Sequence, residues 1–576
     1  MTEQKEKRPT TAEQPPWEDL PALCWEAVFR RLVSDANLES VSSVCKQFLN
    51  ISNTVWTRLA ITNPMTPRLG SLSGASRPSI HRPQLVPRRS VRRPPPDRPI
   101  PVPLERLDLS NQKSLRFDGL REMGSKFRAL RVLVLYNVGL RGDADLVSIA
   151  ECFPALEEHE IKYPMQDRRA RVTDDGICVL SRKLQRLSRI NVSGNPFLTG
   201  QSLVVLSVNC PSLREVVFRG CGLITGRGVA SLIVNRPHLV SLALSGMEEQ
   251  AIFCEELVDS FRHARGLSCL DFSRSFIWDG LLMAVAEANI PLKRLVFSHS
   301  SGFSFDGIRK IVLKHRGIDD LDLVVVDFLT DRHMRVICEG LRSLTYVDVS
   351  ECSNLTMRTL CDLMRQCPFL EGIEMMMTGL RKDDANETDI VVNSRVRYLR
   401  ISTNVNLTDE CLKKIGRMCP GLCYLEVGDC LKITEDGILG VLKSCPEIRH
   451  LYIHGLENIR NLCVDFVLPQ LEDLHAKDLK LNDEQLVAFI SRCCNLKYLD
   501  LPNCVHLSTK GVGKVVKNCN RVREINLRDC HNVRDDVPFL DWMVSVRPSL
   551  RRIVPPRGVS SEIRDFFLQR GLSCRC

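Results

Sequence analysis

The stretch that decides the fold is Leu422-Cys-Tyr-Leu425-Glu-Val427-Gly-Asp-Cys430-Leu-Lys-Ile433-Thr434, which is followed by Ile438, Val441 and Cys445. Leu425 and Val427, at +3 and +5 from Leu422, share one face of a short strand, because successive strand side chains alternate. Ile438, Val441 and Cys445, at +16, +19 and +23, have the spacing of one helix face. The stretch therefore predicts a strand, a turn and a helix.

This pattern repeats along most of the chain, usually every 26 residues. Seventeen units begin at residues 104, 130, 156, 187, 213, 239, 267, 292, 318, 344, 370, 396, 422, 448, 471, 496 and 522. One unit cannot close a core alone, but stacked units bury the strand face against the helix face. The repeat predicts an α/β solenoid with a continuous parallel sheet on its inner side.

The units Leu344-Thr-Tyr-Val347-Asp-Val349-Ser-Glu-Cys352-Ser-Asn-Leu355-Thr356 and 422–434 resemble the cysteine-containing subtype of the leucine-rich-repeat family, and the likeness covers residues 104–553. It implies a horseshoe with a parallel inner sheet and outer helices. Two features depart from the pattern. His159 takes a core position, which we interpret as structural and not as a metal ligand, and five extra residues lie between Tyr163 and Arg171. That insertion is either a tolerated surface loop or a loop that contacts a partner.

Twelve of the 25 cysteines fall into two slots of the repeat. The first slot, at +8, holds Cys221, Cys352, Cys430, Cys504 and Cys530, and the second, at +23, holds Cys210, Cys367, Cys419, Cys445, Cys494 and Cys519, with Cys152 one residue earlier. Asn195 and Asn404 also occur at +8, which predicts an inward side chain that bonds the loop backbone. No paired CxxC motif with zinc spacing occurs. We therefore predict structural thiols, and no metal or cofactor.

A short module with several large apolar residues precedes the repeats. It spans residues 17–61 and contains three of the five tryptophans of the chain. Asp19 and Pro21 are typical of a helix start, and Trp25, Val28, Phe29 and Leu32 form one helix face. A module of this size lies near the lower limit for independent stability. We expect some of its apolar groups to be exposed for a partner.

The module is similar to an F-box. Leu20-Pro21 opens it, Val28-Phe29 and Leu32 follow, and Val44-Cys45-Lys46, Phe48 and Trp56 complete the pattern, while Leu23 and Asn37 depart from it. The resemblance implies a small all-α domain that docks on a Skp-family adaptor and, through it, on cullin and RING subunits. The contact residues that it implies are Leu20, Pro21, Val28, Phe29, Leu32, Leu38, Val44, Cys45, Lys46 and Phe48.

Most of the net charge of +10 lies between the module and the repeats. Residues 62–103 contain eight Arg, one Asp and eleven Pro, a net charge of +7. This composition predicts an extended linker. The run Arg88-Arg89-Ser-Val-Arg92-Arg93 is a solvated spacer, a nuclear-import signal or a nucleic-acid patch. The absence of interleaved aromatic residues disfavours nucleic acid. Residues 1–16 are predicted to be disordered, and residues 554–576 to form a C-terminal cap or tail.

Positions +2 and +4 of each unit point away from the core, toward the concave face that solenoids use for binding. Thirteen acids occupy them: Asp108, Glu158, Glu160, Glu215, Asp271, Asp320, Asp322, Asp348, Glu374, Glu426, Asp473, Asp500 and Glu524. Four arginines, Arg106, Arg189, Arg294 and Arg400, and five tyrosines share this face. Interfaces favour tyrosine, so we predict that a basic segment of a protein target binds here, with the tyrosines packed on its Lys or Arg stems. The predicted site residues are Tyr346, Asp348, Tyr398, Tyr424, Glu426, Tyr452, Tyr498 and Asp500. Alternatively, the enrichment is background of the repeat family.

The resemblances together imply the substrate-recognition subunit of an SCF-type cullin–RING ubiquitin ligase, with no catalytic residues of its own. The sequence contains no P-loop, GxSxG or HExxH motif. A non-catalytic repeat scaffold outside ubiquitin transfer is the alternative. No apolar run approaches the ~18 residues of a membrane span, and residues 1–14 lack an apolar signal core. We therefore expect no membrane association, and a location in the cytoplasm, the nucleus or both.

Overall fold

The computed structural model describes residues 58–60, 104–111, 117–164, 171–380, 391–570 and 572. The ten adaptor contacts implied by the F-box resemblance, Leu20 to Phe48, lie outside the described residues, as does the predicted linker, residues 62–103. The described residues form two compact units, one comprising 58–60 and 104–190 and the other 191–572. Every helix in the described ranges is too short or too polar to cross a bilayer.

The first unit is a parallel sheet covered by three helices. Its strands are β1 (Arg58–Ala60), β2 (Arg106–Asp108), β3 (Val132–Tyr136) and β4 (Glu158–Lys162), and its helices are α4 (Phe117–Lys126), α5 (Asp143–Cys152) and α6 (Asp174–Lys183). Leu59, Leu107, Leu133 and His159 are register partners across these strands. Strand β1 lies within the 17–61 module, for which the sequence predicts helices only. Strand β5 (Arg189–Asn191) spans the boundary between the units.

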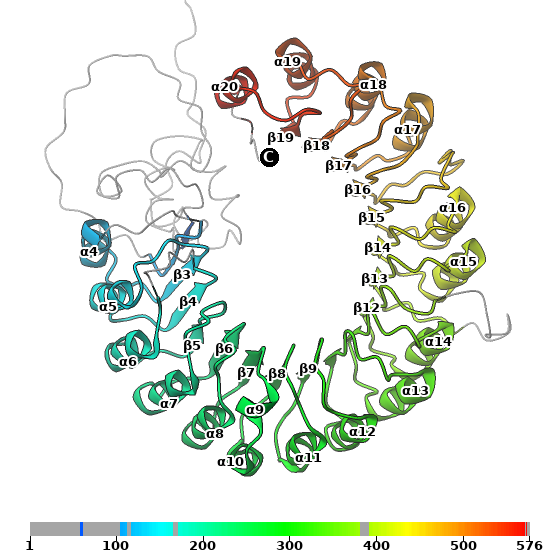
Figure 1. Ribbon diagram of the computed structural model, residues 1–576. Coiled ribbons are helices and arrows are strands. Elements are labelled where there is room, and N and C mark those ends of the chain that lie inside the picture. The colour runs from blue at the N-terminus through cyan, green and yellow to red at the C-terminus, as the bar shows by residue number, and fades with distance from the viewer. Residues whose placement is uncertain are drawn as a thin grey trace, which may run out of the picture. The chain divides into compact units, whose positions relative to one another are not determined.

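The second unit contains a parallel sheet whose strands pair in chain order. They are β6 (Glu215–Arg219), β7 (Ser241–Ser245), β8 (Cys269–Asp271), β9 (Arg294–Val296), β10 (Asp320–Asp322), β11 (Tyr346–Asp348), β12 (Gly372–Glu374), β13 (Tyr398–Arg400), β14 (Tyr424–Glu426), β15 (His450–Tyr452), β16 (Asp473–His475), β17 (Tyr498–Asp500), β18 (Glu524–Asn526) and β19 (Arg552–Val554). Figure 1 shows these strands on the inner side of the unit and its helices on the outer side.

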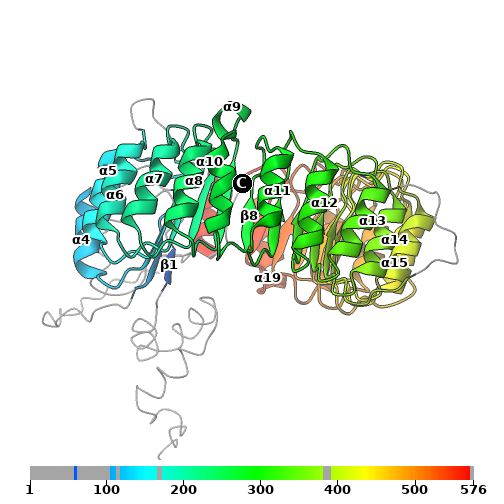
Figure 2. The ribbon, with the colours of Figure 1, turned by 90° about the horizontal axis from the view of Figure 1, so that it is seen from below.

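The helices of the second unit form one outer layer, in which α11 to α14 stand side by side (Figure 2). They are α7 (Gly200–Asn209), α8 (Gly226–Asn235), α9 (Glu249–Ile252), α10 (Glu255–Ser260), α11 (Asp279–Glu287), α12 (Phe305–Lys314), α13 (Asp331–Gly340), α14 (Met357–Gln366), α15 (Asp409–Met418), α16 (Glu435–Ser444), α17 (Asp483–Ile490), α18 (Thr509–Asn518), α19 (Val537–Val546) and α20 (Ser561–Arg570). With β19 and α20, the strand–helix order continues into the segment predicted as a cap or tail.

Burial follows the predicted phases of the repeat. In the unit that begins at Leu422, Leu425, Val427, Ile438, Val441 and Cys445 are completely buried. The sheet face and the helix face thus share one core, as predicted for a leucine-rich-repeat solenoid. Complete burial of a Leu or Val side chain contributes ~1.5–3 kcal/mol, so the repeated apolar set is the main source of stability.

The residues that cap some helices are hydrogen-bonded to the first residue of the preceding helix. Thr434 caps α16, because its side chain accepts a hydrogen bond from the Asp436 N–H. Asp409, the first residue of α15, accepts bonds from the N–H and the hydroxyl of Thr434 at 2.9 and 2.6 Å. Asp483 makes the same pair of bonds to Ser508, which caps α18. These contacts fix the spacing of neighbouring helices.

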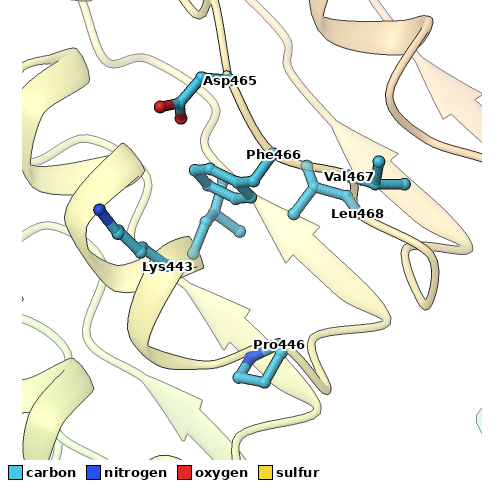
Figure 3. A pocket seen from close by; sticks show the side chains of 7 residues that line it. Lys443, Pro446, Asp465, Phe466, Val467 and Leu468 are labelled. Carbon is cyan, nitrogen blue, oxygen red and sulfur yellow. The ribbon is translucent and has the colours of Figure 1, made fainter.

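The repeat that begins at 448 has no helix between its strand and the next, which the sequence pattern did not predict. Residues 453–472, between β15 and β16, form only turns and loops. The unit that begins at 448 has 23 residues instead of 26, and Pro469 stands where the last helical turn would lie. A hollow of about 330 Å³ remains beside the end of α16. Figure 3 shows the loop residues Asp465 to Leu468 next to Lys443 and Pro446 at this hollow.

The cysteine slots are structural, as predicted. At +8, each thiol donates to a carbonyl of the preceding unit, with Sγ–O distances of 3.5 Å for Cys221, 3.3 Å for Cys352, 3.5 Å for Cys430, 3.2 Å for Cys504 and 3.0 Å for Cys530. At +23, Cys210, Cys367, Cys419, Cys445 and Cys519 end helices. Cys494 is instead exposed and Cys493 is buried, because α17 is shorter and ends at Ile490. Burial raises the pKa of Cys210 to about 12 and keeps its thiol protonated.

His159 is a core residue. Its side chain is completely buried, and Nδ1 lies 3.2 Å from the carbonyl oxygen of Leu133. Burial lowers its pKa to about 4, so the imidazole is neutral near neutral pH. Within the described ranges, no group of three or more His, Cys, Asp or Glu side chains could hold a metal ion.

Candidate functional site

The candidate site is the exposed face of the parallel sheet in the second unit, which we call the wall. The wall consists of the +2 and +4 side chains of β6 to β19. All eight residues predicted as the target site lie on its strands: Tyr346, Asp348, Tyr398, Tyr424, Glu426, Tyr452, Tyr498 and Asp500. Between them, the alternate residues Val347, Leu399, Leu425, Leu451 and Leu499 point into the core and are buried. The strand alternation therefore holds the predicted site residues on one face.

Five rings on the wall form a continuous series, which we call the aromatic column. Tyr346 and Tyr398 have ring centroids 6.4 Å apart, and Tyr398 stacks on Tyr424 at 4.4 Å. Tyr424 lies 4.9 Å from Tyr452, and Tyr452 stacks on His475 at 4.1 Å with an interplanar angle of 8°. The structure thus brings together four of the five predicted tyrosines and adds a histidine.

The tyrosine hydroxyls of the column all donate to wall carboxylates. The bonds run from Tyr346 to Glu374, from Tyr398 to Glu374 at 3.2 Å, from Tyr424 to Glu426 at 2.9 Å and from Tyr452 to Asp473 at 3.2 Å. Burial, with the neighbouring carboxylates, raises the pKa of Tyr398 and of Tyr452 to about 12. The phenols therefore remain protonated donors near neutral pH, and each ring is held at both its face and its hydroxyl.

Arg400 joins two of these carboxylates. Its Nη1 donates to Glu374 at 2.8 Å, and its Nε and Nη2 donate to Glu426 at 2.8 and 3.4 Å. The hydroxyl of Ser402 donates to Glu426 as well. Burial alone would raise the pKa of Glu426, but the bonds from Arg400 and Tyr424 outweigh it and hold this pKa below its ordinary value. Glu426 is therefore an ionised part of the wall's internal network.

His475 makes a second internal network, which the sequence analysis missed. Its Nε2 lies 3.1 Å from Asp473 and its Nδ1 lies 3.0 Å from Asp500. Burial works to lower the pKa of His475, but the two carboxylates outweigh it and raise this pKa to about 9. The imidazole is therefore a cation near neutral pH. His450 and His475 occupy the same +2 and +4 phases as the predicted residues, so reading those phases for histidine would have found both.

Tyr498 lies apart from the column. It is 36% exposed, and it belongs to none of the ring pairs formed by the described residues. It lines a wall hollow of about 260 Å³ together with His475, Asp500, Glu524, Asn526 and Arg552. Arg552 pairs with Glu524 at 3.3 Å, and Asn526 donates to Asp500 at 2.6 Å. The charges around this hollow are thus largely paired internally.

Many +4 side chains also have a local structural role. Asp322 Oδ1 accepts a hydrogen bond from the Val324 N–H at 3.2 Å, and Asp348 Oδ1 accepts one from the Ser350 N–H at 2.9 Å. Asp271 makes the same bond to Ser273. The acid enrichment at this phase is therefore partly explained by the turn that follows each strand, which supports the background alternative at these positions.

The column can contact a partner, but mainly through ring edges. The stacked faces of Tyr398 and Tyr424 cover one another, which leaves their edges for a ligand. The predicted packing of these tyrosines on Lys or Arg stems is therefore restricted, because a cation prefers a ring face and the edge of an aromatic ring is positive. Apolar groups and carbonyl oxygens suit the edges better.

No family model matches the chain. The chain is 25% identical to F-box protein SKIP1 of Arabidopsis thaliana over 157 residues, which is 24% of this chain and 52% of the relative. It is 22% identical to F-box/LRR-repeat protein 4 of Bos taurus over 204 residues, 33% of this chain and 32% of the relative. The chain thus spans about half of the length of the first relative and about a third of the second. The predicted resemblance to F-box proteins with leucine-rich repeats is confirmed.

Among solved structures, the Rad7 and Elc1 complex in yeast contains a similar chain. The match has a TM-score of 0.37 at 14% identity and covers 73% of this chain and 86% of that one. A likeness of this degree does not bear on function.

Proposed function

We propose that this chain, as a relative of F-box proteins with leucine-rich repeats, is the substrate-recognition subunit of an SCF-type cullin–RING ubiquitin ligase. The F-box residues Leu20 to Phe48 bind the Skp-family adaptor, and the wall binds the target protein. The chain performs no chemistry itself. Its contribution is proximity, because holding a target lysine near a ubiquitin-loaded enzyme raises the effective concentration of the reacting groups.

The aromatic column is the observation that supports target binding by the wall. Tyr398 and Tyr424 are fixed by stacking and by hydrogen bonds to Glu374 and Glu426. Side chains that are already ordered lose little conformational entropy when a partner binds. Tyrosine is also enriched among the residues that dominate interface energies. A fixed row of tyrosines on a rigid sheet therefore suits protein recognition.

Adaptor binding is tested by co-precipitation with a Skp-family adaptor. The wild-type chain should retain the adaptor, and the double variant Leu20→Ala/Phe29→Ala should lose it. The wall variant Tyr398→Ala/Tyr424→Ala is the matched control and should retain it. Equal retention by the wild-type chain and the F-box variant would favour the alternative, a repeat scaffold that takes no part in ubiquitin transfer.

Target binding is tested on proteins that proximity labelling finds enriched near the chain when cullin activity is inhibited. Tyr398→Ala/Tyr424→Ala should reduce their capture by at least ~10-fold, since loss of central interface aromatics costs ~2 kcal/mol or more. The control Val234→Ala/Leu313→Ala removes two exposed apolar side chains from α8 and α12. It should leave capture unchanged. If both double variants capture equally, the wall is not the target site.

A further inference from the structure

The pairing of charges on the wall is uneven. Nine acids lie on β8 to β18, and seven of them have an Arg or His partner within 4.0 Å. The seven are Asp271, Asp320, Glu374, Glu426, Asp473, Asp500 and Glu524. Asp322 and Asp348 are the remaining two, and no ion pair in the described ranges includes either.

These two carboxylates are neighbours on the sheet. Asp322 and Asp348 are register partners on β10 and β11. The turn amides of Val324 and Ser350 donate to Oδ1 of Asp322 and Asp348, respectively, and the Ser350 side chain also hydrogen-bonds Asp348. Burial, together with Asp348 and Asp271, raises the pKa of Asp322 to about 6 despite the Val324 N–H and the more distant Arg294. Arg400 acts on Asp348 from a similar remove, so among the described residues the wall holds two carboxylates side by side with no ion pair to either.

The aromatic column begins beside this pair. A Cβ at Gly372 would lie 2.6 Å from Cδ2 of Tyr346, so the absence of a side chain at Gly372 lets the Tyr346 ring lie over β12. Its hydroxyl reaches Glu374 on that strand. The ring therefore leans toward Tyr398 and away from β10. The unpaired carboxylates and the ring edges form one face from β10 to β15, a span of five strand spacings or ~24 Å.

We propose that this face binds an extended, basic segment of the target, with one Arg or Lys side chain between Asp322 and Asp348 and the flanking backbone and apolar groups against the column. The inference rests on the proposed function and names the chemistry of its target. Charge complementarity selects the basic residue, and the positive ring edges place it at the carboxylates instead of over the tyrosines. An extended segment of ~7 residues covers ~24 Å.

This proposal moves the expected binding site for a basic side chain along the wall, to β10 and β11. Glu426 and Asp500 were predicted to take part in target binding, but Arg400 and His475 already neutralise them. A second cation there would compete with an existing ion pair, whereas a cation at Asp322 and Asp348 meets no such competitor among the described residues. The face from β10 to β11 is therefore the part of the wall where a basic side chain gains most.

The test uses the full chain bound to its Skp-family adaptor and a library of synthetic, fluorescein-labelled heptapeptides. Each peptide has Arg, citrulline or Glu at one fixed position and an equimolar mixture elsewhere, and citrulline is a neutral analogue of Arg. We expect the wild-type chain to bind the Arg peptides at least tenfold more tightly than the citrulline peptides at one or two positions. Glu peptides should bind more weakly still.

The variant Asp322→Asn/Asp348→Asn should reduce the ratio of Arg to citrulline affinity to near one. Asn keeps the Oδ1 acceptors for Val324 and Ser350, so the strand ends remain intact. The control Asp465→Asn/Glu447→Gln removes the same charge from exposed residues outside the wall and should keep the wild-type ratio. The inference is wrong if the wall variant keeps that ratio, if the wild-type chain shows no preference for Arg, or if no peptide binds.

Failure of this inference is distinguishable from failure of the proposed function. A chain that binds the adaptor through its F-box but selects neutral or acidic peptides refutes only the basic-segment assignment. A chain whose adaptor binding does not depend on Leu20 and Phe29 refutes the proposed function, whichever peptides it selects.

Discussion

Replacing Arg400 by methionine removes the cation that holds together the centre of the wall. The Arg400 guanidinium bonds Glu374 and Glu426, which are only 7% and 8% exposed. Methionine retains much of the apolar stem but cannot donate a hydrogen bond. The variant therefore leaves two nearly buried carboxylates without a cation, while the tyrosine hydroxyls remain as their donors.

The loss of stability caused by Arg400→Met follows from the hydrogen bonds that the variant cannot make. Arg400 makes two bonds of 2.8 Å and one of 3.4 Å, and a hydrogen bond to a charged group contributes ~1.5–3 kcal/mol. Removing one partner of a buried ion pair costs ~3–5 kcal/mol. The Arg400 side chain is 30% exposed, so water compensates part of the loss, and we expect a local destabilisation of ~3 kcal/mol.

Hydrogen exchange of the backbone amides in β12, β13 and β14 measures this cost. A loss of ~3 kcal/mol corresponds to a ~100-fold loss of protection, since ~1.4 kcal/mol is tenfold. The control Arg294→Met removes one pair, Arg294–Asp320 at 3.2 Å, from a half-exposed arginine. It should cost less than ~1 kcal/mol. Equal losses of protection in the two variants would refute the idea that Arg400 is a buried hub.

The effect of Arg400→Met depends on pH in a defined direction. In the wild-type chain the pKa of Glu426 is lowered, so its contribution to stability is present above the ordinary carboxyl value and is lost as pH falls through the lowered pKa. In the variant, burial without the cation raises the pKa of Glu426, and protonation relieves the penalty. The difference in stability between the wild-type chain and Arg400→Met should therefore shrink as pH falls below ~5. A difference that is constant from pH 7 to pH 4 contradicts this explanation.

Three further predictions concern residues of the second compact unit. Gly372→Ala should displace the Tyr346 ring, because the new Cβ would lie 2.6 Å from it, and should lower stability by ~1–3 kcal/mol in a urea titration; an unchanged midpoint contradicts this. Iodoacetamide should modify the exposed Cys463 and Cys494 before the buried Cys352 and Cys419, with equal labelling in urea as the control, and mass spectrometry reads the order. Binding of Arg peptides should weaken as pH falls through about 6, the pKa to which burial and the facing Asp348 and Asp271 raise Asp322, because protonation removes its charge; binding by Asp322→Asn/Asp348→Asn should not follow pH in this way.

The solenoid was predictable because its signal is redundant. A side chain at +3 or +5 faces the core in every unit, and one misread unit does not alter the phase of the others. Leu425 and Val427 are buried and Tyr424 is half-exposed in the structure, as the alternation of a strand requires. The same phase placed all eight predicted target-site residues on one face of the sheet.

The missing helix between β15 and β16 was not predictable from the repeat alone. The pattern assigns a helix to every unit, and only the shorter length of the unit and Pro469 oppose it. A solenoid tolerates such a unit because each repeat contacts only its neighbours. The sheet continues through β15 and β16 in register at Leu451 and Leu474, so the loss changes the outer layer and leaves the wall continuous.

Which wall acids are neutralised could not be obtained from composition, because pairing depends on contacts between units. Arg219 reaches Asp271 across two units, 52 residues along the chain, and Arg400 serves acids on both adjacent strands. A count of acids and bases at +2 and +4 treats all acids as equivalent. In the structure, most acids on β8 to β18 form an ion pair with an arginine or a histidine. Only Asp322 and Asp348 on these strands have no ion-pair partner, and they are neighbours. The charge available to a partner is therefore local, although the acid enrichment extends along the whole wall.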